Sequence, residues 1–268
     1  MAYRDEFASD DTPRPDVLVC AGLDPSGGAG LIADARVIAE LGGRPVGIVT
    51  TLTVQNTAGV LDGHVVDPEV VRTQLECLLS DVEVRAVKLG MLGSAEVARA
   101  IAVGLALTGA PVVWDPVIYP SRGELPRVDV WIADALVALI PHVTLMTPNA
   151  RELEILTGAP VSTVPEMIAA ARRITRKLNV AVLVKGGHLG GDESVDVLLE
   201  GESTEVLRAP RIPDGHDVHG TGCALSSAIA THLALGHPLL EAVRAAKLYV
   251  ASRIAHPAVP GRGARAIV

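Results

Sequence analysis

The sharpest chemical motif of the chain is HGTGCALSSAIATHLALG at residues 219–236. Gly220, Thr221 and Gly222 stand directly before an apolar helix pattern that is rich in small residues. Several backbone N–H groups can therefore converge at a helix N-terminus, where the free N–H groups and the helix dipole favour an anion. We expect an anion hole that stabilises the charge on a phosphoryl group during transfer.

Cys223 follows this G-T-G segment directly and falls in the first turn of the expected helix. The field at a helix N-terminus lowers the pKa of a thiol, so we expect a reactive, catalytic cysteine. The alternative is a small buried hydrophobic residue, which is the commoner fate of a lone cysteine.

A second glycine-rich loop, GLDPSGGAG, lies between an expected strand and helix, and neither familiar phosphate motif fits it. Gly22 and Gly27 have the spacing of a Walker A loop, but Gly28 stands where that motif requires lysine. Gly28, Gly30 and Ala33 match a dinucleotide fingerprint, but the following strand, VGIVTTLTVQ, has no acidic residue for the ribose. A dehydrogenase is therefore only a distant alternative.

Three polar side chains near the first two expected strands could bind a small ligand. Asp24 and Asp34 could grip hydroxyl or amino groups, although Asp24 could instead cap the turn and Asp34 could face solvent. Gln55 follows the second strand and could form paired hydrogen bonds with the edge of an aminopyrimidine or a heteroaromatic amide.

Four further residues follow the later strands. Asn149 and Glu152 could direct oxygens toward Mg²⁺ and phosphate, or form a capping box at a helix start, and both roles can hold at once. Lys185 ends a buried strand, where lysine is rarely left unpaired, and could reach a nucleotide phosphate. Asp115, followed by proline, could hold a metal ion or cap a turn.

The elements that position these residues alternate along the chain as short β-branched runs and helical patterns. The expected strands are residues 17–22, 46–53, 86–91, 111–117, 144–147 and 180–186. The expected helices are residues 31–41, 68–81, 95–108, 130–139, 150–156, 165–178, 222–235 and 239–254. Two extended stretches around residues 200–203 indicate a hairpin on the sheet edge.

Strands that are apolar on both faces suit a parallel sheet covered by helices on both sides. We therefore predict an α/β fold with a single doubly wound, mostly parallel sheet, flanked by helices on both faces and carrying an edge hairpin. Residues 1–16 are expected to form a flexible N-terminal tail and residues 17–268 one domain, with the site beyond the carboxyl ends of the strands.

Composition excludes several classes of function. Of the 268 residues, 49% are hydrophobic and 20% charged, which argues against a disordered chain. The net charge of −8 gives no electrostatic support for nucleic-acid binding. The sequence contains no run of about 18 apolar residues, which a membrane-spanning helix would need. Three cysteines cannot build a disulfide framework, so we expect a reduced, cytoplasmic setting.

Taken together, the motifs resemble those of a known family. AGLDPSGGAG, VQNT, KLGMLGS, DPV, TPNARE, VKGGH and HGTGCALSSAIA occur in that order over residues 17–252. In this the chain resembles the hydroxymethylpyrimidine/phosphomethylpyrimidine kinases of thiamine biosynthesis, within the ribokinase-like superfamily. The resemblance implies phosphoryl transfer from ATP, with Mg²⁺, to 4-amino-5-hydroxymethyl-2-methylpyrimidine and then to its monophosphate. It also implies a homodimer whose partners are the pyrimidine substrate and ATP.

The resemblance also implies a role for individual residues. The pyrimidine pocket would be lined by Gly22, Asp34, Gln55 and Met91. The anion hole for the transferred phosphoryl group would be formed by Gly220, Thr221 and Gly222. Cys223 would lie near the attacking hydroxyl and act in catalysis. Mg²⁺ and the nucleotide would be organised by Asp115, Glu152, Asn149 and Lys185.

The chain departs from the family pattern beside the expected substrate pocket and at its C-terminal end. Leu23 and Ile32 replace usual polar residues, the segment DPVIYPSRGELP differs from the usual flap, and the ending AVPGRGARAIV is atypical. Two alternatives therefore stay open: a pyridoxal or pyridoxine kinase of the same subtype, and a pyrimidine-binding regulatory module with weak or no transfer.

Overall fold

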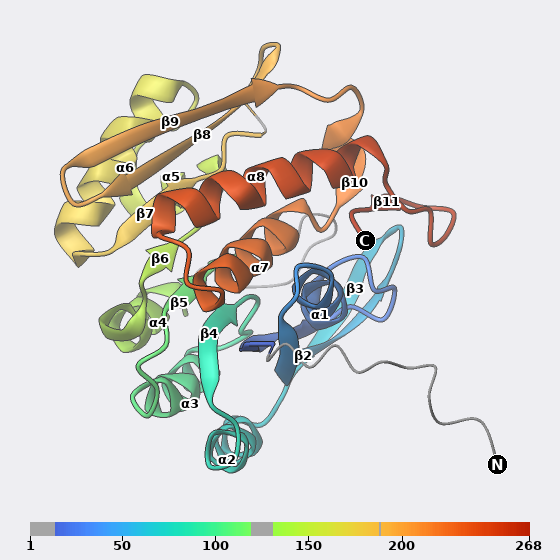
Figure 1. Ribbon diagram of the computed structural model, residues 1–268, viewed down its shortest axis with the longest axis vertical. Helices are drawn as coiled ribbons and strands as arrows, with labels where there is room; N and C mark the ends of the chain where they lie inside the picture. The colour runs from blue at the N-terminus through green and yellow to red at the C-terminus, as the bar shows by residue number, and fades with distance from the viewer. Residues whose placement is uncertain (1–13, 119–130, 188) are drawn as a thin grey trace.

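The computed structural model describes residues 14–118, 131–187 and 189–268 and is built around a nine-stranded sheet (Figure 1). The strands lie in the order β3-β2-β1-β4-β5-β6-β7-β8-β9. They are β1 (Asp16–Leu23), β2 (Arg44–Asn56), β3 (Gly59–Val65), β4 (Val84–Leu89), β5 (Val112–Trp114), β6 (Leu145–Met146), β7 (Ala181–Val184), β8 (Glu193–Glu200) and β9 (Ser203–Pro210). Pairing from β2 to β7 is parallel, and the outer strands β3, β8 and β9 are antiparallel. The predicted fold class and the edge hairpin, β8–β9, are confirmed.

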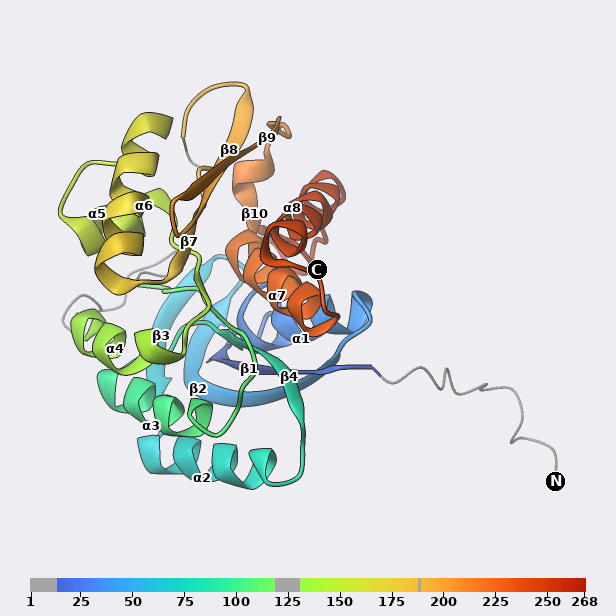
Figure 2. The ribbon, with the colours of Figure 1, turned by 60° about the vertical axis from the view of Figure 1, so that its left-hand side comes forward.

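Helices cover both faces of the sheet (Figures 1 and 2). They are α1 (Gly30–Glu40), α2 (Pro68–Leu79), α3 (Ala95–Leu105), α4 (Ile132–Leu139), α5 (Ala150–Thr157), α6 (Val164–Leu178), α7 (Thr221–Ala234) and α8 (Leu239–Ala255). Two short 3₁₀ turns, Ile140–His142 and Gly215–Asp217, complete the helical segments. Among the residues described, every helix is too short or too polar to span a bilayer.

The core consists of two layers because successive side chains of a strand point to opposite faces of the sheet. Val17 and Val19 of β1 pack with the side chains of α1, α7 and α8, whereas Leu18 and Cys20 pack with those of α2 to α6. Strands buried on both faces explain the continuous apolar runs in the sequence.

Three features at the margins of the sheet differ from the expectations. β3 is an additional strand whose hydrogen bonds come from β2, and its exposed Asp62 and His64 give no apolar pattern. A two-stranded sheet joins β10 (Val218–His219) to β11 (Arg265–Ala266). β1 begins at Asp16, inside the expected tail, because its carboxylate pairs with Arg44 of β2.

Two expectations fall partly on residues that the structure does not describe. The flap DPVIYPSRGELP extends into residues 119–130, and most of the expected N-terminal tail is residues 1–13. The part of the flap that is described, residues 115–118, follows β5 and contributes Asp115 to the carboxyl edge of the sheet.

Replacing Ile101 by alanine tests the packing of the layer under α3. Ile101 is fully buried, so its removal leaves a cavity, and we expect the free energy of unfolding to fall by about 2–5 kcal/mol. Val103, on the same helix, is 52% exposed, and Val103→Ala should change stability by less than about 0.5 kcal/mol. Urea unfolding of the two variants measures the difference, and equal losses would contradict the assigned core.

Candidate active site

The N-termini of α1 and α7 converge beyond the carboxyl ends of the central strands. α1 and α7 pack against each other, and the backbone N–H of Gly30, the first residue of α1, acts to lower the pKa of the Cys223 thiol in the first turn of α7. Two positive helix ends therefore lie close to one side chain.

The two glycines of the G-T-G segment differ in how closely their neighbours approach, and only Gly220 is required by that approach. Gly220 caps α7 with φ of 85°, and a Cβ there would lie 2.0 Å from the carbonyl oxygen of Gly28. A Cβ at Gly222 would lie 3.2 Å from Lys185 Nζ and 3.5 Å from Asp115 Oδ2. Thr221, between them, is the first residue of α7. The backbone at the start of this helix is thus open on the side that faces a lysine and a carboxylate.

Lys185 and Asp115 form a buried ion pair beside Gly222, with 2.6 Å between Nζ and Oδ1. Burial disfavours the charged amine, but the carboxylates of Asp115 and Glu152 outweigh this cost and hold the pKa of Lys185 above its usual value. The partner that a buried lysine requires is therefore Asp115, and Lys185 is a cation at the N-terminus of α7.

Asn149 and Glu152 form the capping box of α5. Asn149 Oδ1 accepts from the backbone N–H of Glu152 at 2.9 Å, and Glu152 Oε2 accepts from that of Asn149 at 2.7 Å. Burial raises the pKa of Glu152 to about 7; Lys185 opposes this shift and the negative charge of Asp115 adds to it. The backbones of Asn149 and Lys185 pair in an isolated parallel β-bridge, which places the cap next to the Lys185–Asp115 pair.

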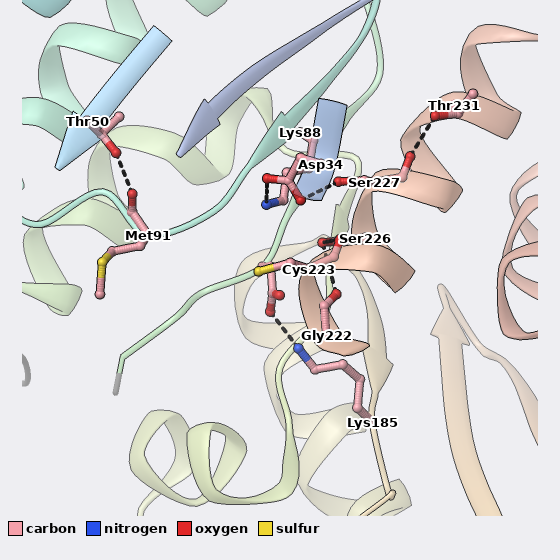
Figure 3. Close-up of polar contacts among 11 residues, drawn as sticks. Asp34, Thr50, Lys88, Met91, Lys185, Gly222, Cys223, Ser226, Ser227 and Thr231 are labelled. Carbon is pink, nitrogen blue, oxygen red and sulfur yellow. Dashed lines mark hydrogen bonds and ion pairs between the residues drawn. The ribbon is translucent and has the colours of Figure 1, made fainter. Parts of the chain in front are cut away.

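Asp34 lies on the other side of Cys223, in an ion pair with Lys88 (Figure 3). Asp34 Oδ2 is 2.5 Å from Lys88 Nζ, and Asp34 Oδ1 accepts from the hydroxyl of Ser227 at 2.7 Å. Asp34 and Lys88 are fully buried. Asp34 is therefore held in place by Lys88 and Ser227, and its expected role in the pyrimidine pocket stays a prediction.

Cys223 projects from α7 between the Lys88–Asp34 pair and Lys185 (Figure 3). Burial raises the pKa of its thiol to about 11; Lys88 and the N–H of Gly30 oppose the shift, while Asp34 and Asp115 add to it. The predicted lowering of this pKa is therefore wrong. The attraction of the helix N-terminus for a thiolate is outweighed by desolvation and by two neighbouring carboxylates.

The remaining expected pocket residues lie at or just after the ends of β1, β2 and β4. Met91 Sδ lies 3.3 Å from the position of a Cβ at Gly22, so the two residues are neighbours. Gln55 lies at the end of β2, where its carboxamide contacts His219 Nε2 at 3.2 Å. Asp24 caps its own turn, as the alternative interpretation had it, by accepting from the backbone N–H of Ser26 at 2.8 Å.

The sequence analysis missed Lys88 and His219. Lys88 ends the buried strand β4, and the reasoning applied to Lys185 could have identified it as a lysine that needs a carboxylate. The contact of His219 with Gln55 joins residues 164 positions apart, and no local pattern indicates it.

The site is suited to a polyphosphate and a cation. Lys185, the start of α7 and the start of α1 favour anions. Asp115 and Glu152 offer carboxylate oxygens, the ligands that Mg²⁺ takes together with substrate phosphates. Within the described part of the chain, no three His, Cys, Asp or Glu side chains gather into a ready-made metal site.

Comparison with known proteins agrees with this geometry. The family model described as phosphomethylpyrimidine kinase matches residues 24–267. The hydroxymethylpyrimidine/phosphomethylpyrimidine kinase of Rhizobium meliloti is 42% identical over 239 residues, covering 88% of this chain and 89% of that protein. The thiamine biosynthesis bifunctional protein ThiED of Geobacter sulfurreducens is 44% identical over 94% of this chain, which spans only 52% of that protein.

Solved structures show the same fold. The pyridoxal kinase of Staphylococcus aureus, in complex with AMP-PCP and pyridoxal, is 28% identical, with a TM-score of 0.85 over 96% of this chain and 93% of that chain. The phosphomethylpyrimidine kinase of Clostridium difficile is 33% identical, with a TM-score of 0.76 over 90% of this chain and 100% of that chain. The extent of the family match and the identity to full-length relatives show that the chain belongs to the phosphomethylpyrimidine kinase family.

Proposed function

We propose that this chain transfers the γ-phosphoryl group of ATP to the hydroxymethyl group of 4-amino-5-hydroxymethyl-2-methylpyrimidine, and then phosphorylates the resulting monophosphate. The observation that carries the proposal is the buried Lys185–Asp115 pair held against Gly222 at the N-terminus of α7. The named activity of the Rhizobium relative and the ATP analogue in the Staphylococcus aureus structure support it.

Lys185 and the backbone N–H groups at the start of α7 would receive the charge of the transferred phosphoryl group. Because these donors are fixed before the reaction, they stabilise that charge without reorganisation. Asn149, beside Lys185, would contact the nucleotide from the cap of α5.

The residues of the site also fit Mg²⁺. Asp115 and Glu152 are both buried, and the charge of Asp115 contributes to the raised pKa of Glu152. A divalent cation would relieve that repulsion, and these two carboxylates would hold it together with phosphate oxygens. When bound, Mg²⁺ would neutralise charge that develops on the phosphates.

In the transfer step, the hydroxymethyl oxygen forms a bond to the γ-phosphorus while the bond from that phosphorus to the bridging oxygen of ADP breaks. The hydroxyl proton leaves to solvent. Cys223 would contact the attacking oxygen rather than act as a ready-made base, since its thiol, with a pKa of about 11, keeps its proton near neutral pH. A loose transition state makes little demand on a strong base.

The same arrangement suits the second substrate. In a monophosphate the attacking group is an anionic phosphate oxygen, which has no proton to lose near neutral pH. A site that depends on placement and on cationic groups, and not on a base, can therefore serve both transfers. Gly22, Met91, Gln55 and Asp34 would line the pyrimidine side, with Asp34 held by Lys88 and Ser227.

A pyridoxal kinase is the second candidate, favoured by the similarity to the pyridoxal kinase of Staphylococcus aureus. Pyridoxal also carries a hydroxymethyl group on a heteroaromatic ring, so the phosphate side of the site would be unchanged. The third alternative, a pyrimidine-binding regulatory module, would retain Gln55 and lack turnover.

We also propose a cytoplasmic homodimer. Cys20, Cys77 and Cys223 are free thiols, which suits a reducing compartment. Leu52 and Val54, 48% and 46% exposed on one face of β2, offer apolar surface that a second copy could cover.

The proposed activity is tested by incubating the purified chain with Mg-ATP and, in separate reactions, the hydroxymethylpyrimidine, its monophosphate and pyridoxal. We expect pyrimidine monophosphate and diphosphate, identified by mass. Lys185→Met protein, purified in the same way, controls for contaminating kinases and should lose the products. Pyridoxal phosphate as the sole product would select the second candidate, and saturable pyrimidine binding without ATP turnover would select the regulatory module.

The state of Cys223 is tested by alkylation in a Cys77→Ser background, which removes the exposed thiol. Because the thiolate reacts and the pKa of Cys223 is raised to about 11, we expect slow modification at pH 7 that accelerates about tenfold per pH unit. Peptide mass spectrometry identifies the site, and Cys223→Ala provides the blank. A rate that reaches its plateau below pH 8 would show a thiolate instead.

Gly222→Ala tests the opening between α7 and Lys185. The added Cβ would lie 3.2 Å from Lys185 Nζ, which would have to shift by a few tenths of an ångström, and it would occupy space before the helix N-terminus, so we expect kcat to fall by up to roughly 10²-fold, the loss for one fixed donor. The KM for the pyrimidine should stay within a few-fold. Gly109, whose Cβ position has no neighbour within 4 Å, provides the matched control, and Gly109→Ala should keep full activity. A fully active Gly222→Ala enzyme would remove this opening from the mechanism.

A further inference from the structure

We propose that His219 is a positioning residue for substrate recognition: it holds the carboxamide of Gln55 in one of two orientations and so sets the order of donor and acceptor that meets the heterocycle. The inference rests on the proposed role of Gln55 in the pyrimidine pocket. His219 belongs to β10 and directly precedes Gly220 of the anion hole.

The Gln55 carboxamide lies between two hydrogen-bonding neighbours. Its Nε2 is 3.2 Å from His219 Nε2, and its Oε1 is 3.2 Å from Thr53 Oγ1. The oxygen and the amino group of a carboxamide have nearly the same shape, so a half-turn about the last side-chain bond exchanges them without changing the packing. The protons of the two neighbours therefore decide which orientation is stable, and they favour the one obtained by exchanging the oxygen and the amino group from the positions given above.

Thr53 favours the amino group of Gln55 on its side. A hydroxyl has one proton to donate, and the carbonyl oxygen of Leu23 accepts from Thr53 Oγ1 at 2.8 Å, the shorter of its two contacts. With the proton committed to Leu23, Thr53 presents only lone pairs to Gln55. An amino group satisfies those lone pairs, whereas a carbonyl oxygen would face them without a hydrogen.

His219 favours the oxygen of Gln55 on the opposite side. Its Nδ1 is buried and has no hydrogen-bond partner among the residues described, so a proton there would be an unsatisfied donor. Its Nε2 lies 3.5 Å from Asp24 Oδ2. Although burial disfavours the charge on Asp24, hydrogen bonds from His219 and Ser26 hold the pKa of this carboxyl below its usual value. A carboxylate beside Nε2 favours the proton on Nε2, and this one N–H is shared between Asp24 and Gln55. A protonated Nε2 has no lone pair for the amino group of Gln55, so the carboxamide oxygen is the group that fits beside it.

The backbone around this contact is held by one segment near the C-terminal end of the chain. The N–H of Ile267 donates to the carbonyl of His219 at 3.1 Å, and the N–H of Ala264 donates to that of Thr57, two residues after Gln55, at 2.7 Å. The imidazole is confined on another side, because His219 Cδ2 lies 3.1 Å from the position of a Cβ at Gly28. His219 therefore has little freedom to follow a rotated carboxamide.

The fixed orientation leaves one N–H and one oxygen lone pair of Gln55 for a ligand. An amino group next to a ring nitrogen is the matching edge, with the oxygen accepting from the amino group and the N–H donating to the nitrogen. In the opposite orientation, amino group would meet amino group. His219 thus favours aminopyrimidines through Gln55 without touching them.

Steady-state kinetics of the full chain tests the inference with His219→Leu, His219→Gln, Gln55→Ala and the double variant Gln55→Ala/His219→Leu. We expect His219→Leu to raise the KM for the hydroxymethylpyrimidine about tenfold, equivalent to about 1.4 kcal/mol. Values of kcat and of KM for ATP should change less than about threefold. His219→Gln, whose side chain retains an N–H donor, should recover most of the loss.

The double variant separates positioning from a general structural effect. If His219 acts through Gln55, His219→Leu adds no further increase in KM once Gln55 is alanine. An equal increase in that background, or a fall in kcat at unchanged KM, would show that His219 acts through the anion hole and would overturn the inference. A Gln55→Ala enzyme with unchanged KM would instead refute the role of Gln55 itself.

A spectroscopic measurement addresses the proton directly. Nitrogen-15 NMR of histidine-labelled protein distinguishes the two neutral tautomers, and the spectrum of His219→Gln assigns the resonances of His219. We expect the proton on Nε2. A proton on Nδ1 would reverse the orientation of Gln55 and contradict the inference.

Discussion

Lys88 and Asp34 form an ion pair in the interior of the protein, and the shape of the site depends on it. Neither side chain is exposed, and Ser227 completes the contacts of the carboxylate. Removing one member of such a buried pair leaves an uncompensated charge, at a cost of about 3–5 kcal/mol, whereas surface pairs contribute about 0–1 kcal/mol. Because the three residues come from β4, α1 and α7, the pair fixes the two helix N-termini relative to the sheet.

The charges around Cys223 are arranged in pairs, which explains why its thiol is not activated in the free protein. Lys88 is paired with Asp34 and Lys185 with Asp115, so the positive charge of each lysine near the thiol is offset by a carboxylate. Desolvation of the thiolate then has the largest effect on the pKa of Cys223. Phosphate would change this balance by competing with Asp115 for Lys185, and a divalent cation would compensate the carboxylate that is released. In the proposed function, binding of Mg-ATP would therefore exchange ion-pair partners within the site.

The sequence was informative where a residue's requirement is local or general, and uninformative where it depends on packing. The cap of α5 needs only residues three apart, and the need of a buried lysine for a partner identified Lys185 before Asp115 was known to supply it. The helix position of Cys223 was predictable, but its pKa depends on desolvation and on the charges of Lys88, Asp34 and Asp115, which no motif encodes. Similarly, β3 owes its hydrogen bonds to β2, and the contact of Gln55 with His219 forms only when the chain has folded.

The fold alone does not choose between a pyrimidine and a pyridine ring, because kinases named for either substrate share it. Discrimination has to come from polar groups at the edge of the ring, since a site built to hydrogen-bond an amino group rejects a ring without one more strongly than an apolar pocket rejects an extra methyl group. Leu23 departs from the family pattern at this place. Its backbone carbonyl accepts a hydrogen bond from the hydroxyl of Thr53, so the change of the Leu23 side chain leaves the orientation of Gln55 unaffected. If Gln55 binds the ring as proposed, this departure leaves that polar edge unchanged.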